Sequence, residues 1–535
     1  MSSIHLTKIN LMKNYDIAII GYGPVGAVTA NLFAQKGFNI VVVEPKKDIW
    51  NIPRAVHFDG QTQRIFQSMG FMDEISKIIH PMEGISFLNN KGKSIVNLYL
   101  KHDEPINGYD ESVFFNQPIF EKFLRSEANK HINIDLKLGF KLANIEAHES
   151  INNLSILDTN NNAEENITSK YVLACDGANS FVRKSLNIES FDYKCDQDWV
   201  VVDYQVDKEF EINTDRYQIC DYKRPTTIVP ITGQHVRWEF KVNPDDDLET
   251  LEDERNIRKM MQPHLWRLNP DIPLNSGKLL RSSAYTFHGL LANNFKFNNC
   301  YLLGDAAHQM PPFLGQGLCQ GIKDSYNLCW KLTGVTNKSF NKKILNSYSL
   351  ERKGVVDFVI KGAKKQGDII GSQDWLTATL RDLYLNIASF IPRLLKPLKF
   401  QNSWRIKNGI IDKELFPNNV NGVIIPHPAL NIKVDNKLFD EYLGNNFGLL
   451  VFENDINVFN DIKKLNSINL FKENIYHINE DNEFNRDTKI LRWSKENNIS
   501  AAIIRPDQHI YGSVGNENIV NNIDKLVKKL KSEIL

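Results

Sequence analysis

Residues 15–45 read YDIAIIGYGPVGAVTANLFAQKGFNIVVVEP, and this stretch decides the fold class. An apolar run ends at a glycine-rich turn, a helical segment follows to about Lys36, and Gly37 precedes a second apolar run that ends at Glu44. A buried strand, a crossing helix and a second buried strand form the repeating unit of a doubly wound α/β sheet. The sequence therefore predicts an α/β domain built around this unit.

The turn inside this stretch has the spacing of a dinucleotide site. Gly21 allows the tight turn, Gly23 lets the backbone approach a pyrophosphate, and Gly26 lets the helix pack closely on the strand. The N–H groups at the helix start can bind the phosphates. Glu44, at the end of the second strand, can accept hydrogen bonds from an adenosine ribose. The pattern predicts a Rossmann-like domain, but it does not distinguish NAD from FAD.

Composition excludes several classes of partner. The chain has 64 basic and 64 acidic residues, which gives no support for nucleic acid or an anionic membrane as the main partner. The sequence contains no continuous apolar run of about 18 residues, so we predict no membrane span. Its six cysteines lie far apart and form no CxxC pair, so we expect reduced thiols, no metal site and a cytoplasmic location.

Two further strand ends carry polar turns. The segment YVLACDGANSFVRKSLNI ends its apolar run at Asp176, and Ser180 and Arg183 follow. The segment CYLLGDAAHQMPPFLGQG ends its apolar run before Asp305, whose carboxylate suits the hydroxyls of a polyol chain. A plain NAD domain completes its site within about 150 residues. Anchors spread this widely indicate a longer cofactor, such as FAD.

The residues after Asp305 suit a flavin ring. Pro311 and Pro312 stiffen the corner, and Gly315 and Gly317 let N–H groups at a helix start face a developing negative charge. Such a charge develops on the reduced isoalloxazine ring, near its N1–C2=O edge.

Together, the three segments resemble the FAD-dependent aromatic hydroxylases, the single-component flavoprotein monooxygenases, over roughly residues 15–400. In that family the middle segment is associated with both FAD and nicotinamide. The resemblance implies that Arg54, in PRAVHFDGQTQRIFQSMG, approaches the flavin and that Gln117, in NQPIFEKFLR, touches the ribityl region. His308 would shape its turn. The cofactor-binding residues expected are Gly21, Gly23, Gly26, Glu44, Arg54, Gln117, Asp176, Asp305, Pro312, Gly315, Gly317, Leu318 and Cys319.

Two dense segments, residues 217–240 and 282–324, are similar to the 3-(3-hydroxyphenyl)propionate / 3-hydroxycinnamate hydroxylases. The resemblance implies that NADH or NADPH reduces FAD and that O2 adds to give a C4a-hydroperoxyflavin. One oxygen atom then enters the phenolic acid ortho to its hydroxyl group and gives a catechol. Two alternatives stay open: a hydroxylase of another phenol, of resorcinol or phenol type, and a non-hydroxylating flavoprotein on the same scaffold.

Motif position suggests groups around the substrate. A phenol free in solution loses its proton only near pH 10, so the site should favour the phenolate. The candidates for this role are His57, Tyr217, Tyr222 and His288. Arg224 or Arg237 could hold a substrate carboxylate through two parallel hydrogen bonds. For the tyrosines and histidines the alternative is a packed side chain with a satisfied polar tip, and for the arginines it is an ordinary ion pair.

The organisation expected is α/β, and α+β overall. An FAD-binding domain would carry an inserted β-sheet substrate domain and a C-terminal thioredoxin-like domain, the last implied by the resemblance. No cysteine follows Cys329, so this last domain has no CxxC and no redox role. A homodimer is left open. The limits are 1–14 for an N-terminal extension, 15–190 and 291–400 for the FAD-binding domain, 191–290 for the substrate domain, 401–420 for a linker and 421–535 for the C-terminal domain.

Overall fold

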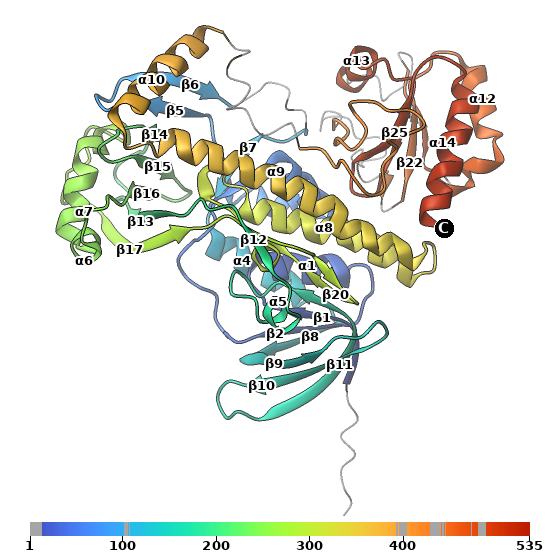
Figure 1. Cartoon of the computed structure of the whole chain (residues 1–535), viewed down its shortest axis with the longest axis horizontal. Coiled ribbons are helices and arrows are strands. Elements are labelled where there is room, and N and C mark those ends of the chain that lie inside the picture. The colour runs from blue at the N-terminus through green and yellow to red at the C-terminus, as the bar shows by residue number, and fades with distance from the viewer. Residues whose placement is uncertain are drawn as a thin grey trace, which may run out of the picture. The chain divides into compact units, whose positions relative to one another are not determined.

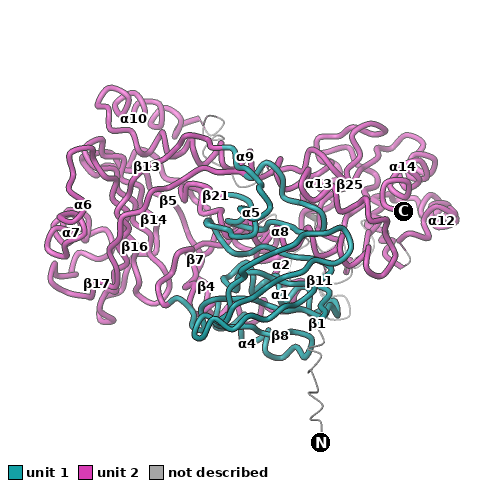
Figure 2. Tube along the Cα trace, turned by 60° about the horizontal axis from the view of Figure 1, so that its bottom comes forward, with its two compact units in different colours: residues 1–50, 121–191, 292–308 teal, residues 51–120, 192–291, 309–535 magenta. Residues whose placement is uncertain are grey.

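The structure is a computed structural model that divides into two compact units (Figure 2). Unit 1 comprises Met1–Trp50, Glu121–Phe191 and Ala292–His308, and unit 2 comprises Asn51–Phe120, Asp192–Leu291 and Gln309–Leu535. The residues described are 13–100, 105, 107–391, 394, 404–427, 440, 443, 444, 446–471, 473–479 and 488–535. Most of the expected N-terminal extension lies outside them, and the predicted domain limits stay predictions.

Unit 1 is built on a largely parallel sheet (Figure 1). Strands β20, β11, β1, β2 and β8 pair in parallel, whereas β10 and β9 continue from β11 as antiparallel strands. Helix α1 (Pro24–Ala34) links β1 and β2 and packs on both, which confirms the predicted strand–helix–strand unit. The strands are β1 (Lys13–Ile20), β2 (Ile40–Glu44), β8 (Ile134–Leu138), β9 (Phe140–Glu146), β10 (Asn152–Asp158), β11 (Glu164–Ala174), β19 (Lys296–Phe297) and β20 (Cys300–Leu302).

Unit 2 contains a second sheet, with the strand order β17-β13-β16-β15-β14-β5-β6. Its strands alternate between two faces. Val236, Trp238 and Phe240 of β16 belong to the apolar core that includes residues of α6 (Leu248–Glu252) and α7 (Glu254–Met261). The strands are β5 (Gly84–Leu88), β6 (Ser94–Tyr99), β13 (Gln197–Gln205), β14 (Arg216–Ile219), β15 (Thr226–Pro230), β16 (His235–Lys241) and β17 (Lys278–Phe287).

The opposite face of the second sheet, which we call the polar face, carries buried charged side chains. They include Asp203 of β13 and His235, Arg237 and Glu239 of β16. Strand side chains alternate between the two faces, so these residues point away from the apolar core that packs against α6 and α7. A buried polar face is costly unless its groups find partners or bind a ligand, so this face is the natural place in unit 2 to look for a site.

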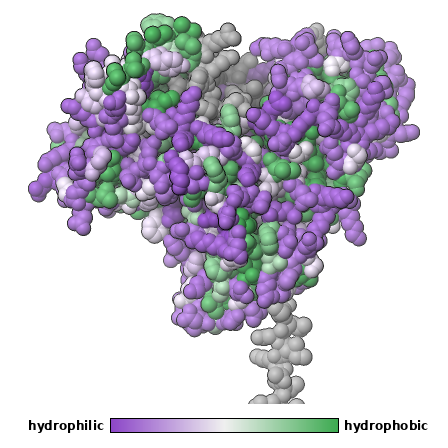
Figure 3. All heavy atoms as spheres, viewed as in Figure 1, coloured by the Kyte–Doolittle hydropathy of each residue, from purple (hydrophilic) through white to green (hydrophobic). Residues whose placement is uncertain are grey.

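Three long helices follow the second sheet in the chain: α8 (Gly317–Thr336), α9 (Ser347–Ile370) and α10 (Trp375–Phe390). Helix α10 rests on β6, with Leu385 and Ala388 in the apolar core there. Its other side exposes apolar side chains, which form a green patch near the top of Figure 3. They are Trp375, Leu376, Leu380, Leu383, Tyr384, Ile387 and Phe390.

The C-terminal part of unit 2 has its own mixed sheet, ordered β23-β22-β24-β25. The thioredoxin-like assignment of this part stays a prediction. The elements are β22 (Gly448–Val451), α12 (Ile456–Lys463), β23 (Ile475–His477), α13 (Thr488–Glu496), β24 (Ala501–Ile504), β25 (Ile510–Val514) and α14 (Ile519–Ile534).

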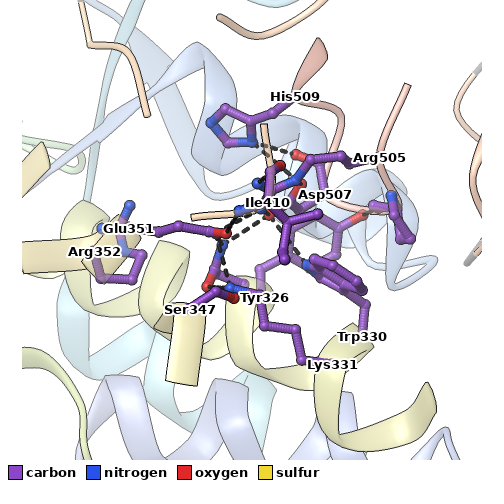
Figure 4. A network of polar contacts seen from close by, with 12 residues as sticks. Tyr326, Trp330, Lys331, Ser347, Glu351, Arg352, Ile410, Arg505, Asp507 and His509 are labelled. Carbon is purple, nitrogen blue, oxygen red and sulfur yellow. Dashed lines mark hydrogen bonds and ion pairs between the residues drawn. The ribbon is translucent and has the colours of Figure 1, made fainter. Parts of the chain in front are cut away.

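A buried network of charges joins this sheet to α8 and α9 (Figure 4). Glu351 of α9 pairs with Lys331 of α8 at 2.8 Å and with Arg505, which follows β24, at 2.7 Å. Arg505 also pairs with Asp507 at 2.6 Å. The backbone N–H of Ile410 donates to Glu351 at 2.9 Å. Each acid therefore has a cation and further donors, as buried charges require.

Candidate functional site

The three predicted motif segments meet at one edge of the unit 1 sheet. The N–H of Cys175 donates to the carbonyl of Ile20 at 2.7 Å, and the N–H of Leu303 donates to the carbonyl of Ala174 at 3.0 Å. The carboxyl ends of β1, β11 and β20 therefore lie side by side, with Gly21, Asp176 and Gly304 just beyond them. Ligands of open α/β sheets bind outside this edge.

The glycines of the first turn have separate reasons to be glycine. Gly21 has φ +98°, and a Cβ there would lie 2.3 Å from the carbonyl oxygen of Cys175. A Cβ on Gly26 would lie 2.1 Å from the carbonyl oxygen of Gly21. A Cβ on Gly23 would meet no atom within 4 Å. Gly21 and Gly26 thus serve the fold, whereas Gly23 keeps open a space that the pyrophosphate of a dinucleotide fits.

Asp176 carries a buried polar atom without a partner. Its Oδ2 accepts from the N–H of Val182 at 3.0 Å, whereas Oδ1 has no hydrogen bond. Burial raises the pKa of Asp176 above its ordinary value. Arg183 donates to the carbonyl of Ala306 at 2.8 Å and so joins the second motif segment to the third. The orphaned oxygen is suited to a ligand hydroxyl.

The two other acids predicted to bind the cofactor in unit 1 lie near the same edge. Glu44 accepts from the N–H of Tyr22 at 2.7 Å and from that of Lys46 at 2.9 Å, so its carboxylate is fixed next to the glycine turn. Asp305 is exposed in the short 3-10 helix η2 (Gly304–Ala306). A Cβ on Gly304 would lie 3.1 Å from Val25, which places this turn beside the start of α1.

In unit 2 the Arg54 segment is held on both sides. Gln117, at the start of α4 (Gln117–Ala128), accepts from the N–H groups of Arg54 and Ala55 at 2.9 and 2.7 Å. Arg237 donates to the carbonyl of Arg54 at 2.6 Å. The side chain of Arg54 is exposed. Gln117 and Arg237 therefore position the backbone from which Arg54 projects.

His57 is fixed beneath the glycine turn before α8. Its Nδ1 hydrogen-bonds to the carbonyl of Gly315 at 3.0 Å, and its Nε2 pairs with the hydroxyl of Ser112. A carbonyl only accepts, so Nδ1 carries a proton and Nε2 of the neutral ring accepts. Burial lowers the pKa of His57, which favours this neutral form. With both nitrogens occupied, His57 supports the turn, and a role as the phenol's base does not follow.

The turn supported by His57 is the one expected at the flavin ring. Gly315 has φ +64°, and a Cβ there would lie 3.0 Å from Nδ1 of His57. Pro312 opens the 3-10 helix η3 (Pro312–Leu314), and Gly317 begins α8. Leu318 and Cys319 are buried in the first turn of α8, and burial raises the pKa of the Cys319 thiol to about 12.

The other catalytic candidates do not gather around one point. Tyr217 packs against the core on the α6 and α7 side of the second sheet, and its hydroxyl accepts from Asn213 at 2.9 Å. His288 is 42 % exposed and pairs with Asp196 at 3.0 Å. Tyr222 lies in the loop between β14 and β15. Tyr217 and His288 thus match the alternative of a side chain with a satisfied polar tip.

Both candidate carboxylate clamps have partners within the chain. Arg224 donates to the two oxygens of Asp246 at 2.7 and 2.8 Å. Arg237 is buried and donates to Asp203 at 3.1 Å and to the carbonyls of Pro53 and Arg54. The geometry matches the ion-pair alternative, so neither arginine is carried forward as a substrate clamp.

Arg237 belongs to a compensated cluster on the polar face. Asp203 also accepts from His235 at 3.0 Å and pairs with Arg281 at 2.5 Å. Burial by itself raises the pKa of Asp203, but the His235 hydrogen bond and the charges of Arg237 and Arg281 lower it below its ordinary value. Asp203 therefore stays ionised and holds Arg237 against the Arg54 segment.

Sequence reasoning missed two residues of the same face, Arg216 of β14 and Glu239 of β16. The alternation in HVRWEFKV does place Glu239 on one face with Arg237. Such alternation normally indicates a solvent-facing side of a strand, and nothing in the sequence indicates that this face is buried.

Within the part of the chain that the structure describes, no helix combines the length and apolar character that a bilayer crossing requires. No group of three or more His, Cys, Asp or Glu side chains in that part could hold a metal ion.

Comparison with known sequences supports the cofactor assignment. Residues 14–363 match a family model described as an FAD binding domain. The 3-(3-hydroxy-phenyl)propionate/3-hydroxycinnamic acid hydroxylase of Burkholderia cenocepacia is 30% identical over 72% of this chain and 69% of that protein. A probable NADH-specific resorcinol 4-hydroxylase of Rhodococcus jostii is 27% identical over 94% of this chain and 92% of that protein.

Comparison with solved structures gives the same fold. The flavin-dependent monooxygenase PieE, solved with FAD and substrate, superimposes with a TM-score of 0.77 at 16% identity and covers 97% of this chain and 99% of its own. The chain therefore belongs to the FAD binding domain family. It is an FAD-dependent aromatic monooxygenase, as the resemblance of its motifs predicted.

Proposed function

We propose that the protein hydroxylates a phenolic acid, 3-(3-hydroxyphenyl)propionate or 3-hydroxycinnamate, at the position ortho to its hydroxyl group. One phenolic acid, one O2, one NAD(P)H and one proton give one catechol, one water and one NAD(P)+. The observation that carries this proposal is the 30% identity with the Burkholderia hydroxylase over 388 residues. NADH is the proposed donor, since the Rhodococcus relative is named NADH-specific.

FAD fits the residues present, and its bound ring would supply the chemistry by taking two electrons from NAD(P)H and activating O2. In unit 1 the residues proposed to hold FAD are Gly21, Gly23, Gly26, Glu44, Asp176 and Asp305. In unit 2 they are Arg54, Gln117, Pro312, Gly315, Gly317, Leu318 and Cys319. The open space at Gly23 and the orphaned Oδ1 of Asp176 support the first set. The anchoring of Arg54 by Gln117 and of Gly315 by His57 supports the second.

Replacing Asp305 by Ala is expected to weaken FAD binding by about tenfold or more, because hydrogen bonds to a charged group contribute about 1.5–3 kcal/mol. The side chain is exposed, so its loss leaves the fold intact. The measurement is the dissociation constant of FAD from flavin fluorescence during titration of the apoprotein. Glu146→Ala, an exposed acid on β9, serves as the matched control. Unchanged affinity in Asp305→Ala would remove Asp305 from the cofactor site.

The proposed function is tested by product analysis during NADH oxidation. The purified yellow protein is offered 3-(3-hydroxyphenyl)propionate, 3-hydroxycinnamate, resorcinol and phenol separately. The proposal is supported if one of the phenolic acids gives a catechol with a higher kcat/KM than resorcinol or phenol. NADH loss that yields only H2O2 with every phenol indicates a relative that does not hydroxylate these compounds, and no NADH loss at all indicates a silent flavoprotein.

A second candidate is hydroxylation of a resorcinol-type phenol. It is favoured by the Rhodococcus relative, a probable resorcinol 4-hydroxylase that is 27% identical over 94% of this chain. In the same assay, a higher kcat/KM with resorcinol than with either phenolic acid would select this candidate.

We also propose a cytoplasmic location, which the six free cysteines support. Five of them are buried, and the structure pairs none of the six. Whether the chain forms a homodimer stays a prediction.

A further inference from the structure

Glu239 and Arg216 lie near each other on the polar face of the second sheet. Glu239 is on β16, opposite Thr227 of β15, and Thr227 is opposite Gln218 of β14. Arg216, the first residue of β14, lies two residues before Gln218 and so on the same face. The two strands are thus separated by β15 alone, a spacing of about 10 Å. The turn before α8 lies on this face, because Phe313 packs edge-on against Trp199 with 5.7 Å between ring centroids. Arg216 also donates to the carbonyl of Phe313.

Neither side chain is compensated as a buried charge normally is. Glu239 is 9% exposed and has neither a hydrogen bond nor an ion pair within 4.0 Å among the described residues. Arg216 has a buried Nε without a partner, and its bond to Phe313 is long, at 3.4 Å. Every other charged side chain named on this face has a partner: Asp203, His235, Arg237 and Arg281 hold one another. A buried acid and a partly buried guanidinium left apart indicate a ligand that satisfies both.

The electrostatics at Glu239 come from few groups. Burial raises its pKa above the ordinary value, even though Arg237 of its own strand and Arg216 of β14 act to lower it. Asp203 of β13 adds to the rise, and β15 presents only Thr227 and Val229, which do not titrate. Burial lowers the pKa of Arg216, while Glu239 acts to raise it. An acid with a raised pKa is a stronger proton acceptor than an ordinary surface carboxylate.

We propose that Glu239 and Arg216 together bind the phenolic hydroxyl of the substrate, and that Glu239 is the base that takes its proton. This inference rests on the proposed function and names two substrate contacts that the family resemblance did not supply. A phenolic hydroxyl is one donor and also an acceptor. It can therefore donate to Glu239 and accept from Arg216 at the same time, which no carboxylate ligand can do.

The proton step balances within these groups. The phenol O–H bond breaks, its electron pair stays on the phenolate oxygen, and the proton forms an O–H bond with Glu239. Arg216 then donates to the phenolate oxygen and stabilises its charge. The phenolate ring is richer in electrons at the ortho carbon, where hydroxylation is proposed. Deprotonation and stabilisation thus come from two strands of one rigid sheet, and Glu239 is a catalytic residue under this proposal.

Glu239→Gln is the direct test, because the amide keeps the size of the side chain but cannot take a proton. We expect kcat/KM for catechol formation to fall by about 100-fold or more, the usual contribution of a positioned base. In the wild type, kcat/KM falls as the pH drops through the pKa of Glu239, since the protonated acid cannot accept. Glu239→Gln loses this limb, and its activity rises only toward the free phenol's pKa, near 10. Glu239→Asp is expected to retain the limb at an intermediate rate.

Controls separate the outcomes. FAD content and thermal unfolding show whether each variant is folded and loaded, and Glu249→Gln, an exposed acid of α6, is expected to match the wild type. Wild-type rate and pH profile in Glu239→Gln would overturn the inference while leaving the hydroxylase assignment intact. If Glu239→Gln fails to load FAD, Glu239→Asp decides, and a wild-type rate of catechol formation there also overturns the inference. A wild type that forms no catechol from any phenol overturns the proposed function, and this inference falls with it.

Discussion

Gly23→Val is expected to give a folded protein that has lost FAD. The backbone at Gly23 has φ −70°, which any residue adopts, and a Cβ there meets no atom within 4 Å. The added side chain therefore costs the fold little. It would occupy the space in which a pyrophosphate meets the start of α1, and the phosphates would lose their hydrogen bonds to backbone N–H groups. Two such bonds, at about 1.5–3 kcal/mol each, correspond to about 100-fold or more in affinity.

Gly26→Val is the matched variant, three residues further along the same turn. A Cβ there would overlap the carbonyl oxygen of Gly21 at 2.1 Å, so the strand and helix cannot keep their close packing. We expect Gly26→Val to lower the thermal unfolding midpoint even without cofactor, which Gly23→Val does not. The flavin absorbance of the purified proteins and circular dichroism of the apoproteins measure the two effects. A yellow Gly23→Val protein would contradict the phosphate assignment of this turn.

Glu351→Ala is expected to destabilise unit 2 by about 3–5 kcal/mol, the usual cost of breaking a buried ion pair by removing one partner. Glu351 is fully buried and is the carboxylate that Lys331 and Arg505 share. Its removal takes away the carboxylate that pairs with Lys331, in a site where burial already lowers the pKa of Lys331 to about 8. The thermal unfolding midpoint of the FAD-loaded protein and its rate of proteolysis report the loss.

The comparison for Glu351 is an exposed pair. Glu74 and Lys77 pair at 2.6 Å on the surface, and Glu74→Ala should change the unfolding midpoint little. The network also predicts a pH dependence. Burial by itself raises the pKa of Glu351, but Arg505 and Lys331 lower it below its ordinary value. Its stabilising effect is therefore full above the ordinary carboxyl pKa and lost as the pH falls through the lowered one. Equal midpoints for Glu351→Ala and Glu74→Ala would contradict the account of the network.

The meeting of the three motif segments was predictable because each segment is a local pattern at the end of a parallel strand. Gly21, Gly23 and Gly26 act within one strand–turn–helix, so their spacing carries the geometry. Asp176 follows β11, which pairs with β1, and Gly304 follows β20, which pairs with β11, and parallel strands bring their carboxyl ends to one edge. A pattern of apolar runs that each end in a glycine or an acid therefore predicts the meeting of these segments.

The substrate half was harder to predict because partners there come from distant parts of the chain. Arg237 resembles a carboxylate clamp in sequence, yet Asp203 and the carbonyls of Pro53 and Arg54 occupy it. His57 resembles a base until Gly315, which lies 258 residues away, takes one of its nitrogens. Glu239 resembles an exposed strand residue until the face that it shares with Arg237 proves to be buried. The spacing of these residues in the sequence does not show which of them already have hydrogen-bond or ion-pair partners in the fold.

The central claim is that this chain uses FAD to insert one atom of O2 into a phenolic acid. The most direct measurement is mass spectrometry of the product formed from 3-(3-hydroxyphenyl)propionate, NADH and oxygen-18 gas by the purified protein. The account predicts a catechol whose new hydroxyl oxygen is oxygen-18. A catechol that carries oxygen from water, or NADH oxidation that leaves every phenol tested unchanged, would contradict it.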